Sequence, residues 1–188
     1  MKFFTFILSV LSIVVLNAFS AVAQSVGAVI ADLRGLIATT RDLSDIVYDL
    51  TPDDIAYQGP QILTELFHIS DELIRTTNDA EEAAAQGPLP PPAADAVNDL
   101  YTEFAFTYLY LAGLINQNIL DVDDLGAGGE VVQHFVLVEL MHQEGLIDAL
   151  SDAIESLIPD SAMVNATNAL NSINGTIAKA AAAMNVSS

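Results

Sequence analysis

Three histidines are the residues of this chain best suited to metal or acid–base chemistry, and their spacing does not favour either. His68 stands alone, and His134 and His142 are eight residues apart, which places them about 80° apart around a helix. The two zinc ligands of an HExxH motif share one face instead. Glu130 precedes His134 by four residues and Glu139 precedes His142 by three, a spacing typical of ordinary pairs on a helix surface. We therefore predict no metal site.

The acidic segment DVDDLGAGGE resembles a calcium-binding loop only in part. Asp121, Asp123 and Gly126 match the first, third and sixth positions of an EF-hand. The twelfth position, which normally supplies a bidentate carboxylate, is Val132. We interpret the segment as a flexible acidic loop, with weak cation binding as the alternative.

Composition gives no support for an enzyme or for a nucleic-acid-binding protein. The chain has no cysteine, and it contains 25 acidic against 5 basic residues, for a formal net charge of −20. Such a field repels phosphate backbones and anionic lipid surfaces. A GxSxG motif and a glycine-rich phosphate loop are both absent from the sequence. With so many carboxylates, no catalytic pair stands out. We predict a protein that is not an enzyme, needs no cofactor and does not bind nucleic acid.

The first residues, MKFFTFILSVLSIVVLNAFSAVAQS, have the pattern of a secretory signal peptide. Lys2 supplies the positive start, an apolar run follows, and Ala21-Val22-Ala23 is a small-x-small cleavage signal. We predict a signal peptide at 1–23 and one mature domain at 24–188, secreted to the extracellular space or the cell wall. A retained membrane anchor is the alternative. No later apolar stretch has the roughly 20 residues needed to span a bilayer, so the mature chain is expected to lack a transmembrane anchor.

The rest of the chain carries the apolar periodicity of packed helices. Apolar residues recur every three or four positions in five segments, separated by TPDD, by the proline-rich QGPLPPP, by the acidic loop and by Pro159. Pro60 follows Gly59 and suits the first position of a helix. We predict an all-α, single-domain bundle of about five helices, over residues 26–50, 60–85, 93–119, 129–157 and 160–184.

The third of these segments is unusually aromatic. Phe104, Phe106, Tyr108 and Tyr110 alternate with other residues, as in a half-buried strand. On a helix, Phe104 and Tyr108 instead fall on the apolar stripe, whereas Phe106 and Tyr110 point to nearly the opposite side. The long helical periods on either side favour the helix, and a strand is the alternative. The segment is therefore predicted to be a helix with two apolar faces.

Two apolar faces on one helix have a structural and a functional interpretation. A central helix packed on several sides is apolar all round. Alternatively, the second face lines a cavity for an acyl chain, or it meets a hydrophobic partner or solid. We hypothesise that six aromatic residues supply the contact area for a hydrophobic surface or a fatty acid: Phe67, Phe104, Phe106, Tyr108, Tyr110 and Phe135.

The last predicted helix differs from the others in charge. Every acidic residue lies at or before Asp160. After it come three N-x-S/T sequons, at Asn165, Asn174 and Asn185, which predict glycosylation sites in an exported protein. The alternative is that Asn and Ser simply replace charge on a solvated face.

Three stretches together resemble the fungal hydrophobic surface-binding protein family, also called the cell-wall galactomannoprotein family. They are VIADLRGLIATTRDLSDIVYDL, ILTELFHISDELIRTTNDAEEAA and LIDALSDAIESLIPDSAMVNATNALNSINGTIAKA. The resemblance covers most of the mature chain and rests on the pattern and order of helices. It includes no catalytic motif.

The resemblance implies a secreted or cell-wall helical bundle that adsorbs to hydrophobic surfaces or holds a fatty acid between its helices. Cell-wall polysaccharide is a further partner that it implies. The alternative function is that of a structural cell-wall mannoprotein acting through its glycans. The segment EFAFTYLYLAGL is more aromatic than the family's third helix. Its rings therefore either fill a lipid cavity or form its walls.

Overall fold

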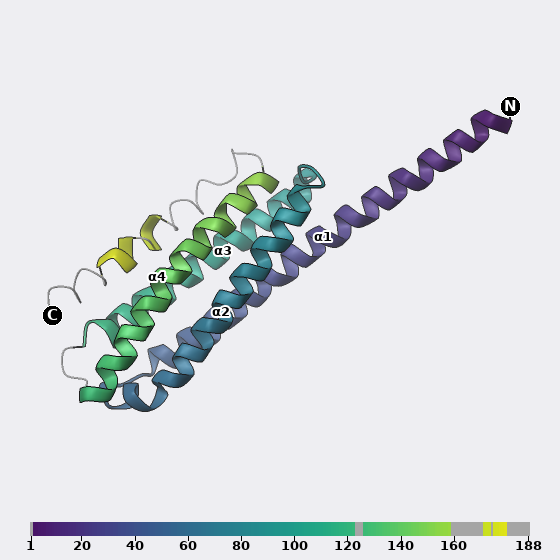
Figure 1. Ribbon diagram of the computed structural model, residues 1–188. Helices are drawn as coiled ribbons and strands as arrows, with labels where there is room; N and C mark the ends of the chain where they lie inside the picture. Colours follow the sequence, from purple (N-terminus) through teal and green to yellow (C-terminus); the bar gives the residue numbers. More distant parts are fainter. Residues whose placement is uncertain (1, 123–125, 159–170, 174, 180–188) are drawn as a thin grey trace.

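The computed structural model describes residues 2–122, 126–158, 171–173 and 175–179, with side chains described from residue 24 onward and, in the fourth helix, from residue 128. Its long helices are α1 (Lys2–Tyr48), α2 (Ile55–Ala84), α3 (Pro91–Ile115) and α4 (Gly126–Leu157). They pack side by side, and the N-terminal part of α1 extends beyond the bundle (Figure 1). No strand occurs in these ranges. The predicted all-α bundle is confirmed.

The helices are not all equally close. Helix α2 packs against both α1 and α4, and α3 packs against α1, whereas α3 and α4 approach each other at few points. The fifth predicted helix falls largely outside the described residues. Its described parts, 171–173 and 175–179, are helical, and Ile173 and Ile177 are buried. Helices α3 and α4 therefore make much less contact with each other than α2 makes with α1 and α4.

The apolar stripe that the sequence predicts along α1 is confirmed. Val29, Leu33, Leu36 and Leu43 are all fully buried, because residues spaced by three and four share one face of a helix. The helix begins at Lys2 rather than near residue 26, so the predicted signal segment is helical and continuous with it. No helix among the described residues is long and apolar enough to cross a membrane.

The start of α2 differs from the prediction. The TPDD break forms a 3-10 turn, Pro52–Asp54, and α2 begins at Ile55, so Pro60 lies inside the helix rather than at its first position. A proline there removes one backbone hydrogen bond. Close packing stabilises this turn instead, because a Cβ at Gly59 would lie 2.5 Å from a methyl carbon of Val132 in α4.

The predicted linker and the end of α3 are fixed by hydrogen bonds. Gly87 adopts a φ of 110°, which favours glycine, and the Leu89 N–H donates to the Leu157 carbonyl. After α3 comes one π-helical turn, η2 (Asn116–Leu120), whose Ile119 carbonyl accepts a hydrogen bond from Gln133 Nε2 at 2.7 Å. The acidic loop that follows lies partly outside the described residues.

Candidate functional site

One face of α3 presents three buried rings to the interior. Tyr101, Phe104 and Tyr108 are each 0% exposed. The Phe104 ring lies 6.5 Å from that of Tyr101 and 5.9 Å from that of Tyr108, between centroids. The predicted helix, rather than a strand, is confirmed for this segment. We call the contact zone between α3 and α4 that is marked by Tyr101 and Tyr108 the α3–α4 seam.

A polar cluster is buried at one end of this seam. The Tyr108 hydroxyl donates to Gln143 Oε1 at 2.6 Å, and Gln143 Nε2 donates to the Leu66 carbonyl at 2.6 Å and to Ser70 Oγ at 3.1 Å. Ser70 Oγ donates in turn to Glu139 Oε1 at 2.5 Å. The cluster joins α2, α3 and α4, and its members satisfy one another, as buried polar groups must.

Burial keeps the Tyr108 hydroxyl protonated. Loss of solvent raises the pKa of Tyr108 well above its ordinary value, and the negative charges of Glu139 and Glu144 raise it further. A protonated phenol is a hydrogen-bond donor. The proton of this hydroxyl is donated to Gln143, and two carboxylates act on the same group.

The Tyr101 hydroxyl lies at the other end of the seam and has no hydrogen-bond partner among the residues that the structure describes. Burial raises the pKa of Tyr101 above its ordinary value, and the nearby Ser151 hydroxyl only partly offsets this effect. The two hydroxyls are close enough for Ser151 to influence the phenol, but their geometry is not that of a hydrogen bond. An unpaired buried hydroxyl typically costs about 1–3 kcal/mol. Tyr101 is thus a donor available to a ligand.

The opposite face of α3 is open. Phe106 and Tyr110 are 54% and 55% exposed, so no described helix covers them. With Arg41, Asp45 and neighbouring residues they line an open hollow of about 420 Å³ between α1 and α3. Arg41 is held at its edge by an ion pair with Glu103 on α3.

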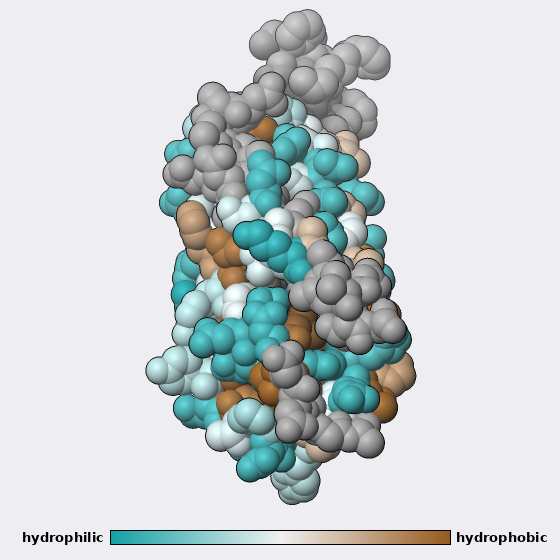
Figure 2. Space-filling view, turned by 90° about the vertical axis from the view of Figure 1, so that its left-hand side faces the viewer, coloured by the Kyte–Doolittle hydropathy of each residue, from teal (hydrophilic) through white to brown (hydrophobic). Residues whose placement is uncertain are grey.

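The two remaining predicted contact residues lie on other helices. Phe67 of α2 and Phe135 of α4 are each 54% exposed, and the Phe135 ring meets that of His134 edge-on. On the face seen in Figure 2, apolar residues reach the surface in separate patches between polar ones. The six predicted residues are therefore not brought together: two are core, two line the hollow, and two lie elsewhere on the surface.

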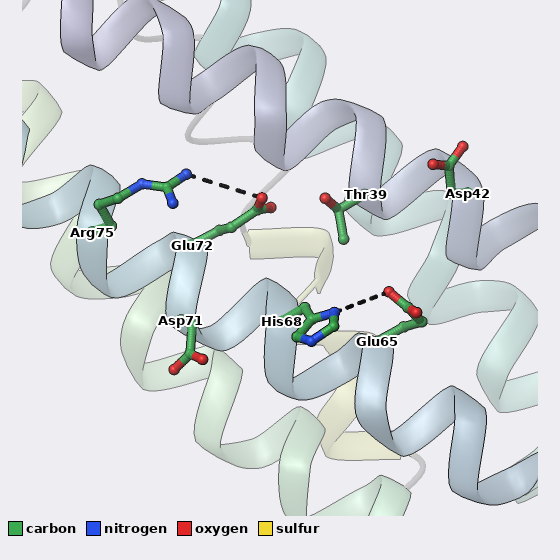
Figure 3. Close-up of a pocket in the computed structure, with 7 residues that line it drawn as sticks. All are labelled: Thr39, Asp42, Glu65, His68, Asp71, Glu72 and Arg75. Atoms are coloured by element: carbon green, nitrogen blue, oxygen red, sulfur yellow. Dashed lines mark hydrogen bonds and ion pairs between the residues drawn. The ribbon is translucent and has the colours of Figure 1, made fainter.

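A polar groove runs between α1 and α2 (Figure 3). Its volume is about 320 Å³, and Figure 3 shows His68 turned toward Glu65 and Arg75 toward Glu72. Arg75 Nε also lies 3.0 Å from Asp32 Oδ1. The described residues contain no group of three or more acidic or histidine side chains arranged to hold a metal ion. The groove is lined by polar side chains, with two ion pairs within α2 and one, Arg75–Asp32, that joins α2 to α1.

Sequence reasoning missed three functional candidates: Tyr101 and Gln143 in the seam, and Ser70 of α2, whose hydroxyl accepts a hydrogen bond from Gln143. The signal was present, because Ser70 and Gln143 are polar residues at positions that the helical period assigns to the core. The Glu139–His142 pair is formed, with 3.6 Å between Oε1 and Nδ1. The predicted glycosylation sites Asn165, Asn174 and Asn185 lie outside the described residues.

No family model and no curated protein matches this chain. Among solved structures, the chain is similar to that of AFMP4P in a crystal structure in complex with palmitic acid, with a TM-score of 0.69 and 18% sequence identity. The match covers 84% of this chain and 97% of that one. At this identity the likeness establishes a shared helical fold.

Proposed function

We propose that this protein is a secreted, non-enzymatic carrier that holds a fatty-acyl chain in the α3–α4 seam. The observation that carries the proposal is the likeness, over most of the chain, to a fold solved with palmitic acid bound. The sequence supports the rest of it, through the signal-peptide pattern and the lack of cysteine and of a catalytic motif.

The geometry of the seam supports the same proposal. Helices α3 and α4 approach each other at few points, with Tyr108 beside Gln143 and Tyr101 near Ser151. A ligand site between helices is typically apolar with a few fixed polar groups. Tyr101, Phe104 and Tyr108 supply the apolar wall, and the unpaired Tyr101 hydroxyl supplies one polar anchor.

Displacement of a neutral fluorescent probe tests acyl binding. The protein without its first 23 residues is mixed with N-phenyl-1-naphthylamine and titrated with dodecan-1-ol. Burial of a chain is worth about 0.8 kcal/mol for each CH₂ group, so micromolar displacement is expected. Phe104→Leu should weaken it and Phe106→Leu should not. No displacement by any acyl compound would refute the proposal.

Adsorption to hydrophobic surfaces is a second candidate, favoured by the exposed rings of Phe67, Phe106, Tyr110 and Phe135. Large exposed apolar side chains are typical of contact surfaces. Phe67→Ser combined with Phe135→Ser should then reduce binding to oil droplets without changing probe displacement. Equal adsorption by this variant and the parent protein would eliminate these residues as the contact.

Secretion is tested separately. The full chain expressed in a fungal host should appear in the medium with Gln24 as its first residue, read by N-terminal sequencing. Retention of residues 1–23 on an exported or membrane-bound chain would contradict this part of the proposal.

A further inference from the structure

The α3–α4 seam contains two buried phenol hydroxyl groups, of which only that of Tyr101 has its proton free for a ligand. The Tyr101 hydroxyl is buried and unpaired. The Tyr108 hydroxyl donates to Gln143 and is part of the buried polar cluster. Any head group that follows an acyl chain into the seam must meet one of these two places, because they are where the described seam carries polar atoms.

Both places are flanked by negative charge. At the Tyr108 end, Glu139 is 8% exposed at its side chain and accepts a hydrogen bond from Ser70, and Glu144 also acts on the phenol. At the Tyr101 end, the carboxylates that act on the phenol belong to three exposed residues of α4: Glu155, Asp148 and Asp152.

No basic side chain is placed to offset them in the described part of the chain. Arg34, Arg41, Arg75 and Lys179 are all exposed. Arg41 is paired with Glu103, and Arg75 with Asp32.

One imidazole also faces this region from the outside. His142 is 57% exposed at its side chain and stands 3.6 Å from the Glu139 carboxylate. Its charge, when protonated, pairs with Glu139 rather than with a ligand, because Glu139 stands between it and Ser70 in the polar cluster.

A carboxylate anion in this interior would be buried without a cationic partner. Burying an unpaired charge costs several kcal/mol, and neighbouring carboxylates add repulsion. A neutral oxygen has no such cost and can accept a hydrogen bond from the Tyr101 hydroxyl. We propose that the seam selects acyl ligands with an uncharged head group, such as alcohols, esters or protonated acids, and rejects the fatty-acid anion. This inference rests on the proposed function and adds the head-group class.

Two ligands with the same chain length test it. Dodecan-1-ol is neutral throughout, whereas dodecanoic acid loses its proton above the ordinary carboxyl range of about 4–5. Displacement of N-phenyl-1-naphthylamine is measured near pH 8 and near pH 5. The alcohol should bind equally at both, and the acid should bind at least about tenfold more weakly than the alcohol near pH 8 and approach it near pH 5.

The outcomes separate the two proposals. If dodecanoate binds near pH 8 as tightly as the alcohol, the head-group inference is overturned while acyl binding stands. If neither compound displaces the probe at either pH, the acyl-binding function itself fails, and the head-group inference fails with it.

Variants locate the repulsion. Glu139→Gln removes the charge at the Tyr108 end while keeping the shape of the side chain and an oxygen that can accept the Ser70 hydrogen bond. The double variant Asp148→Asn with Asp152→Asn removes two charges at the Tyr101 end without changing the shape of either side chain. One of these should strengthen dodecanoate binding near pH 8 severalfold and leave the alcohol unchanged. Glu130→Gln, at an exposed position of the same helix, is the matched control and should change neither. Unchanged discrimination in every variant would overturn the inference.

Discussion

The two faces of α3 carry the same kinds of ring in opposite environments. Phe104 and Tyr108 are fully buried, while Phe106 and Tyr110, two positions further along in each case, are more than half exposed. The difference follows from the helical period, since a shift of two residues turns a side chain about 200° around the axis. Chemically equivalent residues therefore stabilise the bundle on one face and remain available for contact on the other.

The largest expected effect is the difference in stability loss between alanine substitutions on the buried and on the exposed face of α3. Phe104→Ala should lower the free energy of unfolding by about 3–5 kcal/mol, because it removes a buried ring and leaves a cavity. Phe106→Ala should change it by less than about 0.5 kcal/mol, as at an ordinary surface position. Urea unfolding followed by circular dichroism measures both. Similar losses in the two variants would mean that the faces are not distinct.

A smaller effect is expected for the buried polar cluster behind the aromatic face. Gln143→Leu leaves the Tyr108 hydroxyl and the Leu66 carbonyl without their partner, at a cost of about 1–3 kcal/mol. Tyr108→Phe removes the donor of the hydrogen bond between Tyr108 and Gln143. In a double-mutant cycle the combined loss should be smaller than the sum of the single losses. Strict additivity would show that the hydrogen bond between these side chains contributes nothing.

Removing the tyrosine hydroxyl should affect stability differently at the two ends of the seam. Tyr101→Phe removes a hydroxyl that has no partner, so the midpoint of thermal unfolding should stay equal or rise slightly. Tyr108→Phe removes a hydroxyl that donates to Gln143 and should cost about 1 kcal/mol. An equal loss in both variants would indicate that Tyr101 is hydrogen-bonded after all.

The smallest expected effect concerns Asp79 of α2, which lies away from α3 and close to Asp32 of α1. Burial, and then the neighbouring carboxylate of Asp32, raises the pKa of Asp79 above its ordinary value. The folded state thus binds the proton more tightly than the unfolded state, so this contribution to stability is present at low pH and is lost as pH rises through the folded pKa. Asp79→Asn should stabilise the protein at neutral pH by a few tenths of a kcal/mol.

Its measurement is the difference in unfolding free energy between the variant and the parent protein as a function of pH. The advantage of Asp79→Asn should shrink on acidification. A constant difference would show that folding does not raise the pKa of Asp79. Asp99→Asn, at an exposed position on α3, serves as the comparison.

Helical periodicity was sufficient to predict the fold and the division of α3. The stripe that contains Phe104 and Tyr108 is buried and the side that contains Phe106 and Tyr110 is not, as helical spacing requires. The start of α2 could not be predicted, because proline suits the first turn of a helix by local preference, whereas in the fold the turn around Gly59 packs closely against Val132 of α4. That contact lies between segments far apart in the sequence.

The site was harder to predict than the fold. Aromatic content alone grouped Phe67 and Phe135 with the α3 rings, although they lie on α2 and α4. The structure instead brings Tyr101 and Gln143 to the seam, with Ser70 of α2 hydrogen-bonded to Gln143. Which helix faces which cannot be read from the period of one helix, so the polar partners of Tyr108 emerge only when α2, α3 and α4 are placed together.

Five tyrosines in the chain allow one measurement that tests the central claim directly. Nuclear magnetic resonance spectra of protein with isotope-labelled tyrosine rings are recorded during titration with dodecan-1-ol. Binding in the α3–α4 seam should shift the ring signals of Tyr101 and Tyr108 and leave those of Tyr48, Tyr57 and Tyr110 in place. A shift of the Tyr110 ring, with those of Tyr101 and Tyr108 unchanged, would place the ligand on the exposed face of α3 and contradict the account.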